Sequence, residues 1–277
     1  MKISLITACY NAEKTIGDAL ESVTRQKGVV VEFIIMDGGS TDGTIAQVKA
    51  FVEKVRGNAA LTVQWQSAHD AGMYDALNKG IAWATGDVVG ILNADDVLAD
   101  ETTLATIVAA FESDAVEAVY GDVRFVRELG GRTVRYCSAR WFRPWMFRFA
   151  VMVPHPSFYC RRELFARFGG YSLDYRICAD FELVMRYLWK HRVRTHYIPQ
   201  CLVEMRLGGA STAGLGSTIE INREDLRALR ANGHWSALWL IYLKYLFKIW
   251  GFVFRRDRGR GRGANHPKRS SIGCLKR

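Results

Sequence analysis

Two adjacent carboxylates follow an apolar stretch and are the residues whose chemistry is easiest to interpret. Asn93-Ala94-Asp95-Asp96 comes directly after residues 88–92, a short apolar run that predicts a buried strand. Like charges this close repel, and a divalent cation bound beside them would relieve the repulsion. Carboxylate and phosphate oxygens are ligands that suit Mg²⁺ or Mn²⁺. Alternatively, Asp95 and Asp96 form only an Asx turn before a helix that begins near Glu101, and the sequence leaves both interpretations open.

A second polar segment, Asp37-Gly38-Gly39-Ser40-Thr41-Asp42-Gly43-Thr44, follows another predicted strand. Its glycines permit a tight backbone, and Ser40, Thr41 and Asp42 are residue types that cap a following helix. Asp37 stands before the cap begins, so it could accept hydrogen bonds from a base N–H or a ribose hydroxyl. The sequence has neither a Gly-x-Gly-x-x-Gly motif after the first strand nor a P-loop motif, which disfavours a dinucleotide dehydrogenase and a P-loop enzyme.

The first half of the chain alternates strands and helices, and these elements must position the polar residues. Apolar runs predict strands at residues 3–8, 31–36, 61–65 and 88–92, and helical spacing predicts helices at 13–25, 44–55 and 74–84. This order predicts an α/β fold with a mostly parallel central sheet flanked by helices, and with a ligand crevice at the carboxyl ends of the strands. The polar residues follow the four strands in turn: Asn11, Asp37, Asp70 and Asn93 to Asp96.

The ordered set of motifs resembles the inverting family 2 glycosyltransferases with the GT-A (nucleotide-diphospho-sugar transferase) fold. The resemblance covers about residues 1–210 and is carried by five segments, of which the third looks most like bacterial enzymes that assemble exopolysaccharides of the colanic-acid kind. The segments are Thr7-Ala8-Cys9-Tyr10-Asn11, residues 37–44, Asp70-Ala71-Gly72-Met73-Tyr74-Asp75-Ala76-Leu77-Asn78-Lys79-Gly80, Asn93-Ala94-Asp95-Asp96 and Ala179-Asp180-Phe181-Glu182.

The resemblance implies a donor site and a metal site. Asp37 would contact the base, Asp95 the ribose or metal, and Asp96 the Mg²⁺ or Mn²⁺ that bridges the donor diphosphate. The full set of implied donor-binding residues is Thr7, Ala8, Tyr10, Asn11, Asp37, Asp70, Gly72, Asn78, Lys79, Asn93, Ala94 and Asp95. Asn93 replaces an Asp that other members carry, and Leu77 replaces an Arg that often precedes the Asn of the third motif. A UDP-sugar is favoured as donor, with a GDP-sugar as the alternative.

The second half of the chain would supply the acceptor side. Asp180 falls in the first turn of a predicted helix, where the positive helix end favours an ionised carboxylate. The resemblance implies that Asp180 is the general base that deprotonates the attacking hydroxyl, whereas the residues alone favour an acidic first turn without chemistry. His155 and Trp141 are further candidates for acceptor binding, and Glu182 is a weaker one because it points roughly the other way around the helix.

The net charge of +10 is concentrated at the C-terminus. Nine Lys or Arg and one Asp lie between Arg255 and Arg277, so residues 1–254 carry only +2. This distribution disfavours nucleic acid as a partner and favours a tail that meets an anionic surface. The six cysteines are scattered and predict buried reduced thiols. Because Met1-Lys2 leads directly into a predicted strand, we expect no signal peptide and a cytoplasmic protein.

Residues 234–255 are almost wholly apolar and aromatic, about the length of a membrane span. Lys244 and Lys248 near the middle would be costly in a bilayer, and nothing in the segment offers an internal partner. On a helical projection His234, Ala237, Ile241, Lys244, Lys248, Gly251 and Arg255 share one stripe, and the large aromatic and aliphatic residues cover the rest. We therefore predict an amphipathic helix that lies in the membrane interface; the alternative is that this face packs on the catalytic domain.

These observations predict a catalytic domain at 1–210, with a donor half at 1–121 and an acceptor half at 122–210. A connecting segment at 211–233, the amphipathic helix at 234–255 and a flexible basic tail at 256–277 follow. The predicted protein is peripheral on the inner face of the plasma membrane, and it transfers a sugar to a saccharide or a polyprenyl-diphosphate-linked acceptor. Two rival hypotheses are a sugar-phosphate nucleotidyltransferase and a noncatalytic membrane-bound scaffold. The nucleotidyltransferase would need a Gly-rich loop with a catalytic Arg or Lys after the first strand, and this sequence has none there.

Overall fold

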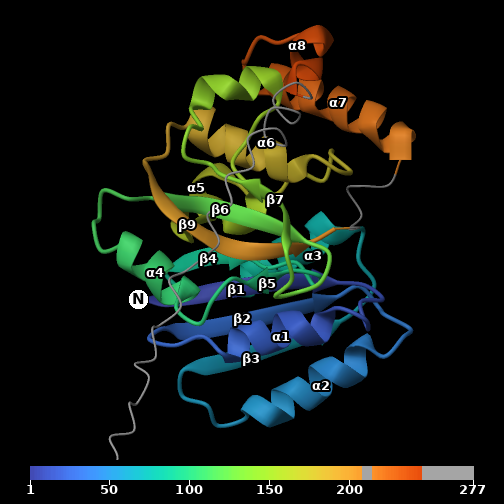
Figure 1. The fold of residues 1–277 in the computed structure, drawn as a ribbon, viewed down its shortest axis with the longest axis vertical. Coiled ribbons are helices and arrows are strands. Elements are labelled where there is room, and N and C mark those ends of the chain that lie inside the picture. The colour runs from blue at the N-terminus through green and yellow to red at the C-terminus, as the bar shows by residue number, and fades with distance from the viewer. Residues whose placement is uncertain (208–213, 245–277) are drawn as a thin grey trace, which may run out of the picture.

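The computed structural model describes residues 1–207 and 214–244 of the 277 residues (Figure 1). Within this part of the chain the strands form one sheet: β1 Lys2–Cys9, β2 Val30–Asp37, β3 Leu61–Ser67, β4 Val88–Ile91, β5 Val97–Leu98, β6 Ala118–Val126, β7 Thr133–Cys137, β8 Tyr159–Arg161 and β9 Thr195–Arg206. The α-helices are α1 Ile16–Thr24, α2 Thr44–Val55, α3 Met73–Trp83, α4 Thr103–Ala110, α5 Glu163–Phe168, α6 Ala179–Met185, α7 Gly214–Ala231 and α8 Leu238–Tyr242. Shorter or irregular helical segments are η1 Pro144–Phe149, η2 His155–Ser157 and η3 Arg186–Lys190.

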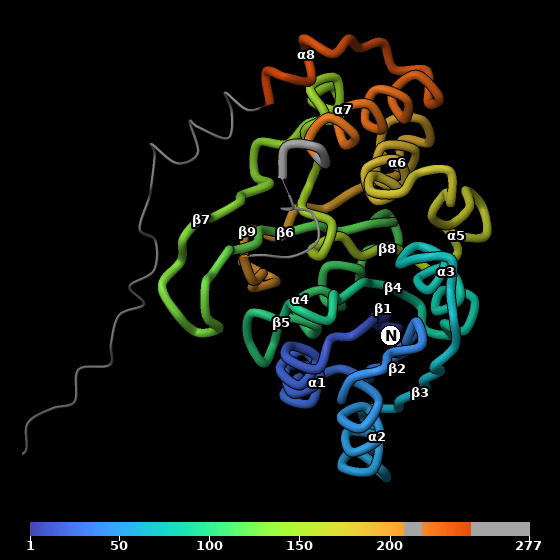
Figure 2. Tube along the Cα trace, turned by 90° about the vertical axis from the view of Figure 1, so that its right-hand side faces the viewer, coloured from blue at the N-terminus to red at the C-terminus, as the bar shows by residue number. Residues whose placement is uncertain are grey.

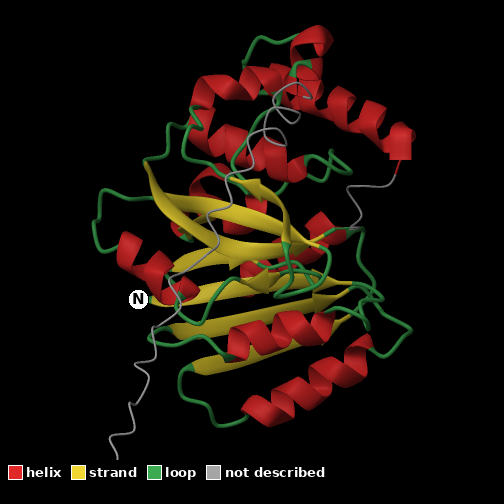
Figure 3. Ribbon diagram, viewed as in Figure 1, coloured by secondary structure: helices red, strands yellow, loops and turns green. Residues whose placement is uncertain are grey.

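The first four strands lie in the order β3-β2-β1-β4, and each neighbouring pair is parallel. A helix between two strands returns the chain to the end where the previous strand began, so successive strands run the same way. The loops after β1, β2 and β3 consequently gather at one edge of the sheet, on the right in Figure 3. The predicted α/β fold and its parallel half are confirmed, and all four predicted strands are present.

The other half of the sheet is mixed and was not predicted strand by strand. β8 pairs antiparallel with both β4 and β6, β6 pairs parallel with β9, and the short β5 pairs antiparallel with β9. β7 pairs with β6 outside the main order of strands. These pairings join segments that are far apart in the sequence, such as residues 118–126 and 195–206, so local periodicity could not reveal them.

Two hydrophobic cores lie on opposite faces of the sheet. Along β1, Ile3 and Leu5 belong to the core that α1, α2 and α4 cover, whereas Ile6 belongs to the core that α3, α5, α6 and α7 cover. This alternation follows from the period of two in a strand. Figure 2 shows α1 and α3 on opposite sides of β1. The second core reaches from the sheet to α6, so it also supports the helix that carries Asp180.

The first helix is shorter than predicted. α1 begins at Ile16 and not at Glu13, because residues 11–13 are held by the loop that follows β2. Glu13 donates its N–H to Asp42 Oδ2 at 3.1 Å, and Glu13 Oε2 accepts the N–H of Gly43 at the same distance. The two loops thus replace the first helical turn with contacts to each other.

The C-terminal helix differs from its prediction. α8 begins at Leu238, not at His234, and its predicted polar stripe faces the protein: His234, Ile241 and Lys244 are buried. Lys244 does have an internal partner, because its ammonium group lies 2.7 Å from Asp225 Oδ2 of α7. Lys248 and the rest of the predicted helix fall outside the described residues. The predicted connecting segment at 211–233 contains α7, which packs on α6 and α8.

Of the helices in the described part of the chain, none combines the length and the apolar character needed to cross a bilayer. Five of the six cysteines fall in the described residues and are free thiols, of which Cys9, Cys160 and Cys178 are buried and Cys137 and Cys201 are half-buried. The prediction of buried reduced thiols is therefore correct for three of them.

A glycine in the middle of β4 lets the two halves of the sheet meet. Gly90 is paired with Tyr159 of β8, and a methyl group at Gly90 would overlap the ring of this fully buried tyrosine. We expect Gly90→Ala to lower the free energy of unfolding by about 1–3 kcal/mol, because an overpacked core must shift its neighbours. Thermal or urea denaturation would measure the loss.

A matched control is Gly17→Ala, which adds the same methyl group to an exposed position of α1, where it meets only the flexible end of the Gln47 side chain and where alanine is the better helix former. This variant should be as stable as the original chain or slightly more stable. Equal stability of the two variants would contradict the role given to Gly90.

Candidate active site

The loops after β1 and β2 are tied together by hydrogen bonds between their polar residues. The N–H of Asn11 donates to Ser40 Oγ at 2.8 Å, and Asn11 Oδ1 accepts the N–H of Thr41 at 2.9 Å. Asn11 has a positive φ of 48°, which asparagine tolerates better than most residues. Asp42 accepts the N–H of Thr44 at 3.0 Å at the start of α2, although the residue at the N-cap position is Gly43.

Asp37 is buried at the end of β2 and its carboxylate organises the loop that follows. Oδ2 accepts the N–H groups of Gly39 and Ser40 at 3.0 and 2.9 Å and the hydroxyl of Ser67 at 2.7 Å, while Oδ1 accepts the hydroxyl of Ser40. Burial raises the pKa of Asp37, but these hydrogen bonds outweigh burial and leave the pKa below its ordinary value. Because these hydrogen bonds already use the lone pairs of its carboxylate, Asp37 could contact a nucleobase only if one of the present donors moved away. The predicted role of Asp37 in binding the nucleobase stays a prediction.

Asp70 lies beside Asp37 at the ends of β3 and β2. Its carboxylate fills the space that a side chain at Gly38 would need, and it accepts the N–H of Gly72 at 2.9 Å. Gly72 has a φ of 117° at the start of α3, a conformation that L side chains rarely adopt. A small hollow opens here between polar side chains that include Asp37, Gln66, Asp70 and Lys79. The structure thus brings the second and third predicted motifs together.

Asp95 and Asp96 follow β4, and Asp96 is buried whereas Asp95 is half-buried. Burial and the negative charge of Asp95 raise the pKa of Asp96 to about 7, which a hydrogen bond from Asn93 and the charge of Arg206 partly oppose. Asn93 Nδ2 donates to Asp96 Oδ2 at 2.8 Å. Asn93 therefore acts as a neutral donor where an aspartate would add a third carboxylate.

The alternative interpretation of Asp95 and Asp96 as the turn before the next helix does not hold. Asp100 closes that turn, since its carboxylate accepts the N–H of Thr102 at 2.8 Å before α4 begins at Thr103. Asp95 and Asp96 are left without a capping role.

The pair of carboxylates has the chemistry of a partial cation site. Among the described residues, no group of three or more His, Cys, Asp or Glu side chains is gathered around one point. Asp95 and Asp96 offer hard oxygen ligands and a local excess of negative charge. This donor set fits Mg²⁺ or Mn²⁺ only if phosphate oxygens and water complete the coordination shell.

Asp180 lies in the first turn of α6, as predicted, and is half-buried. Its Oδ1 accepts the N–H of Phe181 at 2.7 Å and lies 3.4 Å from the hydroxyl of Tyr74. Tyr74 is two residues beyond Gly72, in the first turn of α3. Asp180 is consequently held beside the start of the helix that follows the donor loop, and not on a remote surface.

A cluster of rings packs under Asp180. Tyr171 stacks on Tyr74 with ring centroids 5.5 Å apart, and its hydroxyl lies 2.7 Å from His155 Nε2. Burial lowers the pKa of His155, which the charge of Asp180 partly opposes. The structure therefore brings His155 close to Asp180, as its predicted role on the acceptor side requires, and assigns it a structural bond to Tyr171.

Glu182 is held by contacts inside the protein, and its predicted role in acceptor binding, which would need these contacts to break, stays a prediction. It is buried and forms an ion pair with Arg186, with Nε 2.9 Å from Oε1, and it also accepts from Asn232 Nδ2 at 3.1 Å. Arg186 in turn donates to the backbone carbonyls of residues 168–170. Through Arg186, Glu182 thus stabilises residues 168–170, which lie just before Tyr171.

Asn78 and Thr7 are engaged inside the protein. The side-chain amide of Asn78 donates to the carbonyl of Tyr171 at 2.8 Å and accepts its N–H at 2.9 Å. The hydroxyl of Thr7 is buried and donates to the carbonyl of Leu92 at 2.6 Å, which joins β1 to the end of β4. Both residues position the elements of the site, and their predicted contacts with the donor would need these bonds to change.

The remaining predicted residues are distributed unevenly. Tyr10 is exposed beside Asn11, Ala8 and Ala94 flank the ends of β1 and β4, and Lys79 pairs with Asp75 at 2.8 Å. Trp141 is exposed on the loop after β7, where Arg140 lies over its ring at 5.3 Å. No contact of the described residues joins Trp141 to Asp180, so its role in acceptor binding stays a prediction.

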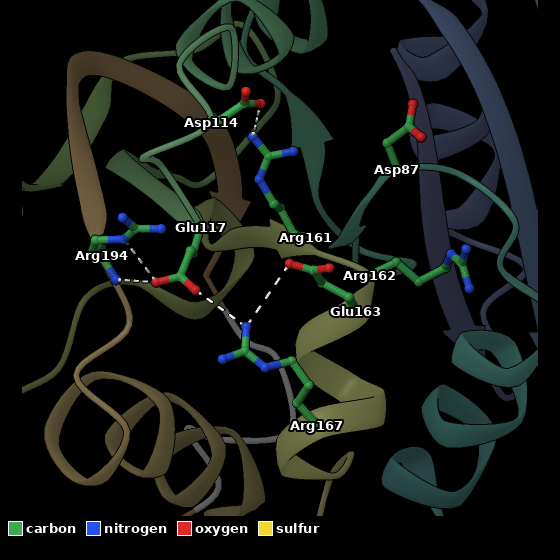
Figure 4. A pocket seen from close by; sticks show the side chains of 8 residues that line it. All are labelled: Asp87, Asp114, Glu117, Arg161, Arg162, Glu163, Arg167 and Arg194. Carbon is green, nitrogen blue, oxygen red and sulfur yellow. Dashed lines mark hydrogen bonds and ion pairs between the residues drawn. The ribbon is translucent and has the colours of Figure 1, made fainter.

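A separate pocket lies away from these residues. It has a volume of about 590 Å³ and is lined by four arginines and four carboxylates, including Asp87, which immediately precedes β4 (Figure 4). This places the pocket at the edge of the sheet where β4 begins, opposite the polar loops. Its arginines are engaged with carboxylates or backbone carbonyls, for example Arg194 with Glu117 at 3.3 Å and Arg162 with the carbonyl of Gly86 at 2.9 Å. The pocket therefore resembles a network of surface ion pairs.

The family model described as "Glycosyl transferase family 2" matches residues 4–168, more than half of the chain. The chain belongs to glycosyl transferase family 2. A "PGL/p-HBAD biosynthesis glycosyltransferase" of Mycobacterium bovis (strain BCG / Pasteur 1173P2) is 30% identical over 230 residues, which cover 82% of this chain and 83% of that protein. An uncharacterized glycosyltransferase of Mycobacterium tuberculosis (strain CDC 1551 / Oshkosh) is 33% identical over 193 residues, 66% of this chain and 68% of that protein.

Solved structures show the same fold at low sequence identity. A mannosyltransferase from Pyrobaculum calidifontis in complex with GDP-Man and Mn²⁺ aligns over 91% of this chain and 72% of that chain, with a TM-score of 0.61 and 20% identity. S. aureus TarS 1–349 in complex with UDP-GlcNAc aligns over 83% of this chain and 66% of that chain, with a TM-score of 0.63 and 19% identity. The chain spans 40% of the longer TarS structure. The predicted GT-A fold is confirmed.

Glu224 of α7 holds the segment before Asp180 and was not identified from the sequence. Its carboxylate accepts the N–H groups of Arg176, Ile177 and Cys178, each at 2.9 Å, just before α6 begins. Burial raises the pKa of Glu224, but these backbone hydrogen bonds outweigh burial and lower it below its ordinary value. Glu224 therefore fixes the segment that leads into Asp180 without touching the reacting atoms.

We expect Glu224→Ala to lower kcat by roughly 100-fold while the KM for donor changes little, because a misplaced base affects the chemical step more than donor binding. Glu224→Gln should recover part of the loss, since its amide oxygen still accepts hydrogen bonds. Steady-state kinetics with a titrated donor would separate kcat from KM.

The control is Glu220→Ala, one turn earlier on α7, where Glu220 pairs loosely with Arg176 at 3.9 Å near the surface. It should retain nearly full activity, because exposed ion pairs contribute little. If Glu224→Ala and Glu220→Ala behaved alike, Glu224 would have no positioning role.

Proposed function

We propose that this protein transfers a sugar, with inversion, from a nucleotide-diphosphate sugar to a hydroxyl group of a saccharide or a lipid-linked saccharide during synthesis of a cell-surface glycoconjugate. The observation that carries the proposal is the position of Asp180 beside Tyr74 at the start of α3, the helix that follows the loop in which Asp70 lies next to Gly38. Membership of glycosyl transferase family 2 supports the same reaction.

In the proposed reaction Asp180 accepts the proton of the acceptor hydroxyl, and the freed oxygen attacks the anomeric carbon. A bond forms from that oxygen to the anomeric carbon as the bond from the carbon to the donor diphosphate breaks on the opposite side, so the configuration inverts. The nucleoside diphosphate leaves with the electron pair. Proton transfer by a positioned side chain contributes roughly 10²–10⁴-fold to such a rate.

Asp95 and Asp96 are the residues that would hold Mg²⁺ or Mn²⁺. A bound divalent cation supplies charge stabilisation for the departing diphosphate. Binding it would also offset the repulsion between the two carboxylates, which is the physical reason for assigning the cation to this pair. The Mn²⁺ in the mannosyltransferase structure supports this choice of ion.

The donor and acceptor are proposed at the level of chemical class. A hexose on uridine diphosphate is favoured, with a GDP-sugar as the alternative, and the two related structures contain UDP-GlcNAc and GDP-Man, respectively. The name of the Mycobacterium bovis relative supports a role in cell-envelope glycoconjugates. A product of the colanic-acid type stays a prediction, as does a location on the inner face of the plasma membrane.

Asp180→Asn tests the mechanism. With Mn²⁺ and the preferred nucleotide sugar, we expect release of nucleoside diphosphate in the presence of acceptor to fall by roughly 10²–10⁴-fold, because an amide cannot act as the base. Donor affinity, measured by calorimetry or by thermal stabilisation, should stay within a small factor. A panel of nucleotide sugars screened for thermal stabilisation would first select the donor.

Asp174→Asn makes the same chemical change at an exposed position of the loop before α6 and should retain activity. Transfer at the normal rate by Asp180→Asn would disprove its role as the base. A wild-type protein that released no nucleoside diphosphate from any nucleotide sugar would favour the noncatalytic scaffold, and formation of a nucleotide sugar from a sugar phosphate would favour the nucleotidyltransferase.

A further inference from the structure

An aromatic face is exposed on α8 and the residues just before it. Trp235, Leu238, Trp239 and Tyr242 are between 42% and 66% exposed, whereas the neighbouring Leu240 and Ile241 are buried. The outward side of α8 is thus its apolar side, the reverse of what an isolated surface helix of a globular domain shows. Such a concentration of large apolar side chains indicates an interaction surface.

The orientation of this face is fixed by contacts on the inner side of α8. Lys244 is buried and lies 2.7 Å from Asp225 of α7, which is also buried. Rotating α8 to bury its aromatic side would expose Ile241 and break this pair, leaving Asp225 charged and unpaired inside the protein. The aromatic residues therefore face outward as a consequence of the ion pair beneath them.

A second element, η1, extends the same surface. α8 packs on η1, and the hydroxyl of Ser236 donates to the carbonyl of Arg148 at 2.7 Å. The guanidinium group of Arg148 lies 6.0 Å from the ring centre of Trp235, and η1 exposes Trp145 to 56%. In Figure 1 α8 and α7 lie at the end of the molecule farthest from α2. We define the docking face as Trp145, Arg148, Trp235, Leu238 and Trp239.

The two segments of the chain that form the docking face carry no acidic residues. Residues 131–162, which include η1, contain no Asp or Glu, and neither do residues 226–244, which include α8. Arg140, Arg143 and Arg148 are exposed on the first of these segments. The sequence beyond the described residues continues this trend, with a net charge of +8 between Arg255 and Arg277. An anionic partner is therefore favoured, and two copies of this face would repel each other.

We propose that η1 and α8 together form a surface that docks on an anionic lipid bilayer. Tryptophan and tyrosine prefer the headgroup level of a membrane, where the ring is partly apolar and its polar group stays hydrated, and arginines beside them bind lipid phosphates. The surface differs from the amphipathic helix expected from the sequence, because η1 contributes two of its five residues and Lys244, just after α8, is buried against the protein.

The docking face is connected to the base by one helix. α7 holds α8 through Asp225 and holds the segment before Asp180 through Glu224, one residue earlier. Docking would thus set the height of Asp180 above the bilayer, where the hydroxyl of a lipid-linked acceptor would be presented. This consequence rests on the proposed function, whereas the docking surface itself does not.

The test is binding of the full chain to sedimented vesicles of phosphatidylcholine with or without phosphatidylglycerol. The variant Trp145→Ser/Trp235→Ser/Trp239→Ser should reduce binding to the anionic vesicles by about tenfold or more, since it removes the large apolar surfaces that would be buried in the bilayer. Arg143→Gln/Arg148→Gln should reduce the preference for anionic over neutral vesicles. Trp83→Ser, which removes an exposed tryptophan from α3, should bind like the original chain.

Three results would overturn the proposal. First, the triple tryptophan variant could bind vesicles as tightly as the original chain, which would assign binding to the basic tail alone. Second, the original chain could bind neither kind of vesicle. A dimer in sedimentation velocity that dissociates only in the triple variant would make a second copy the occupant. Release of nucleoside diphosphate with a soluble acceptor should be unchanged in the triple variant, so failure of docking and failure of the catalytic proposal are distinguishable.

Discussion

The repulsion between Asp95 and Asp96 is the interaction on which the account of this site depends. The fold places the two carboxylates at the end of β4, buries one of them and raises its pKa to about 7. Asp100, and not this pair, closes the turn before α4. A capping function therefore does not explain why two carboxylates are held close together with one of them buried. A cation and a diphosphate at this point would turn an unfavourable arrangement into a binding site.

The acceptor side is built from contacts between segments that are distant in sequence. α7 provides Glu224 to hold the segment before Asp180, α3 provides Tyr74, and the loop after α5 provides Tyr171. Glu182 and Arg186 stabilise that loop from the opposite side. The position of Asp180 therefore depends on packing between segments of the second half of the chain and α3, and the same helix α7 also contacts α8.

Much of the donor half follows from local patterns. The strands and helices up to residue 92 repeat at their expected periods, and the parallel order brings Asn11, Asp37 and Asp70 to one edge, as the sequence predicted. The ordered motifs also identified the family correctly. Local patterns were sufficient there because each polar residue directly follows the strand that positions it.

Local patterns were not sufficient where the outcome depends on long-range partners. Glu182 is two residues from Asp180 and equally acidic, but Arg186 and Asn232 draw it into the interior. The sequence predicts no partner for Lys244 within its own segment, and the partner that the structure shows, Asp225, lies on another helix. Glu224 carries no motif, so only the three N–H groups that it accepts reveal its role. Tyr74, within the third motif, is the one additional residue that the sequence could have suggested.

The most direct measurement of the central claim is the anomalous diffraction of Mn²⁺ in crystals grown with uridine diphosphate. The account predicts one manganese peak in contact with Asp96 and with the diphosphate. It also predicts that the carboxylate of Asp180 points toward that diphosphate. Manganese and nucleotide bound instead in the pocket lined by Arg161 and Glu117, or a diphosphate from which Asp180 points away, would contradict it.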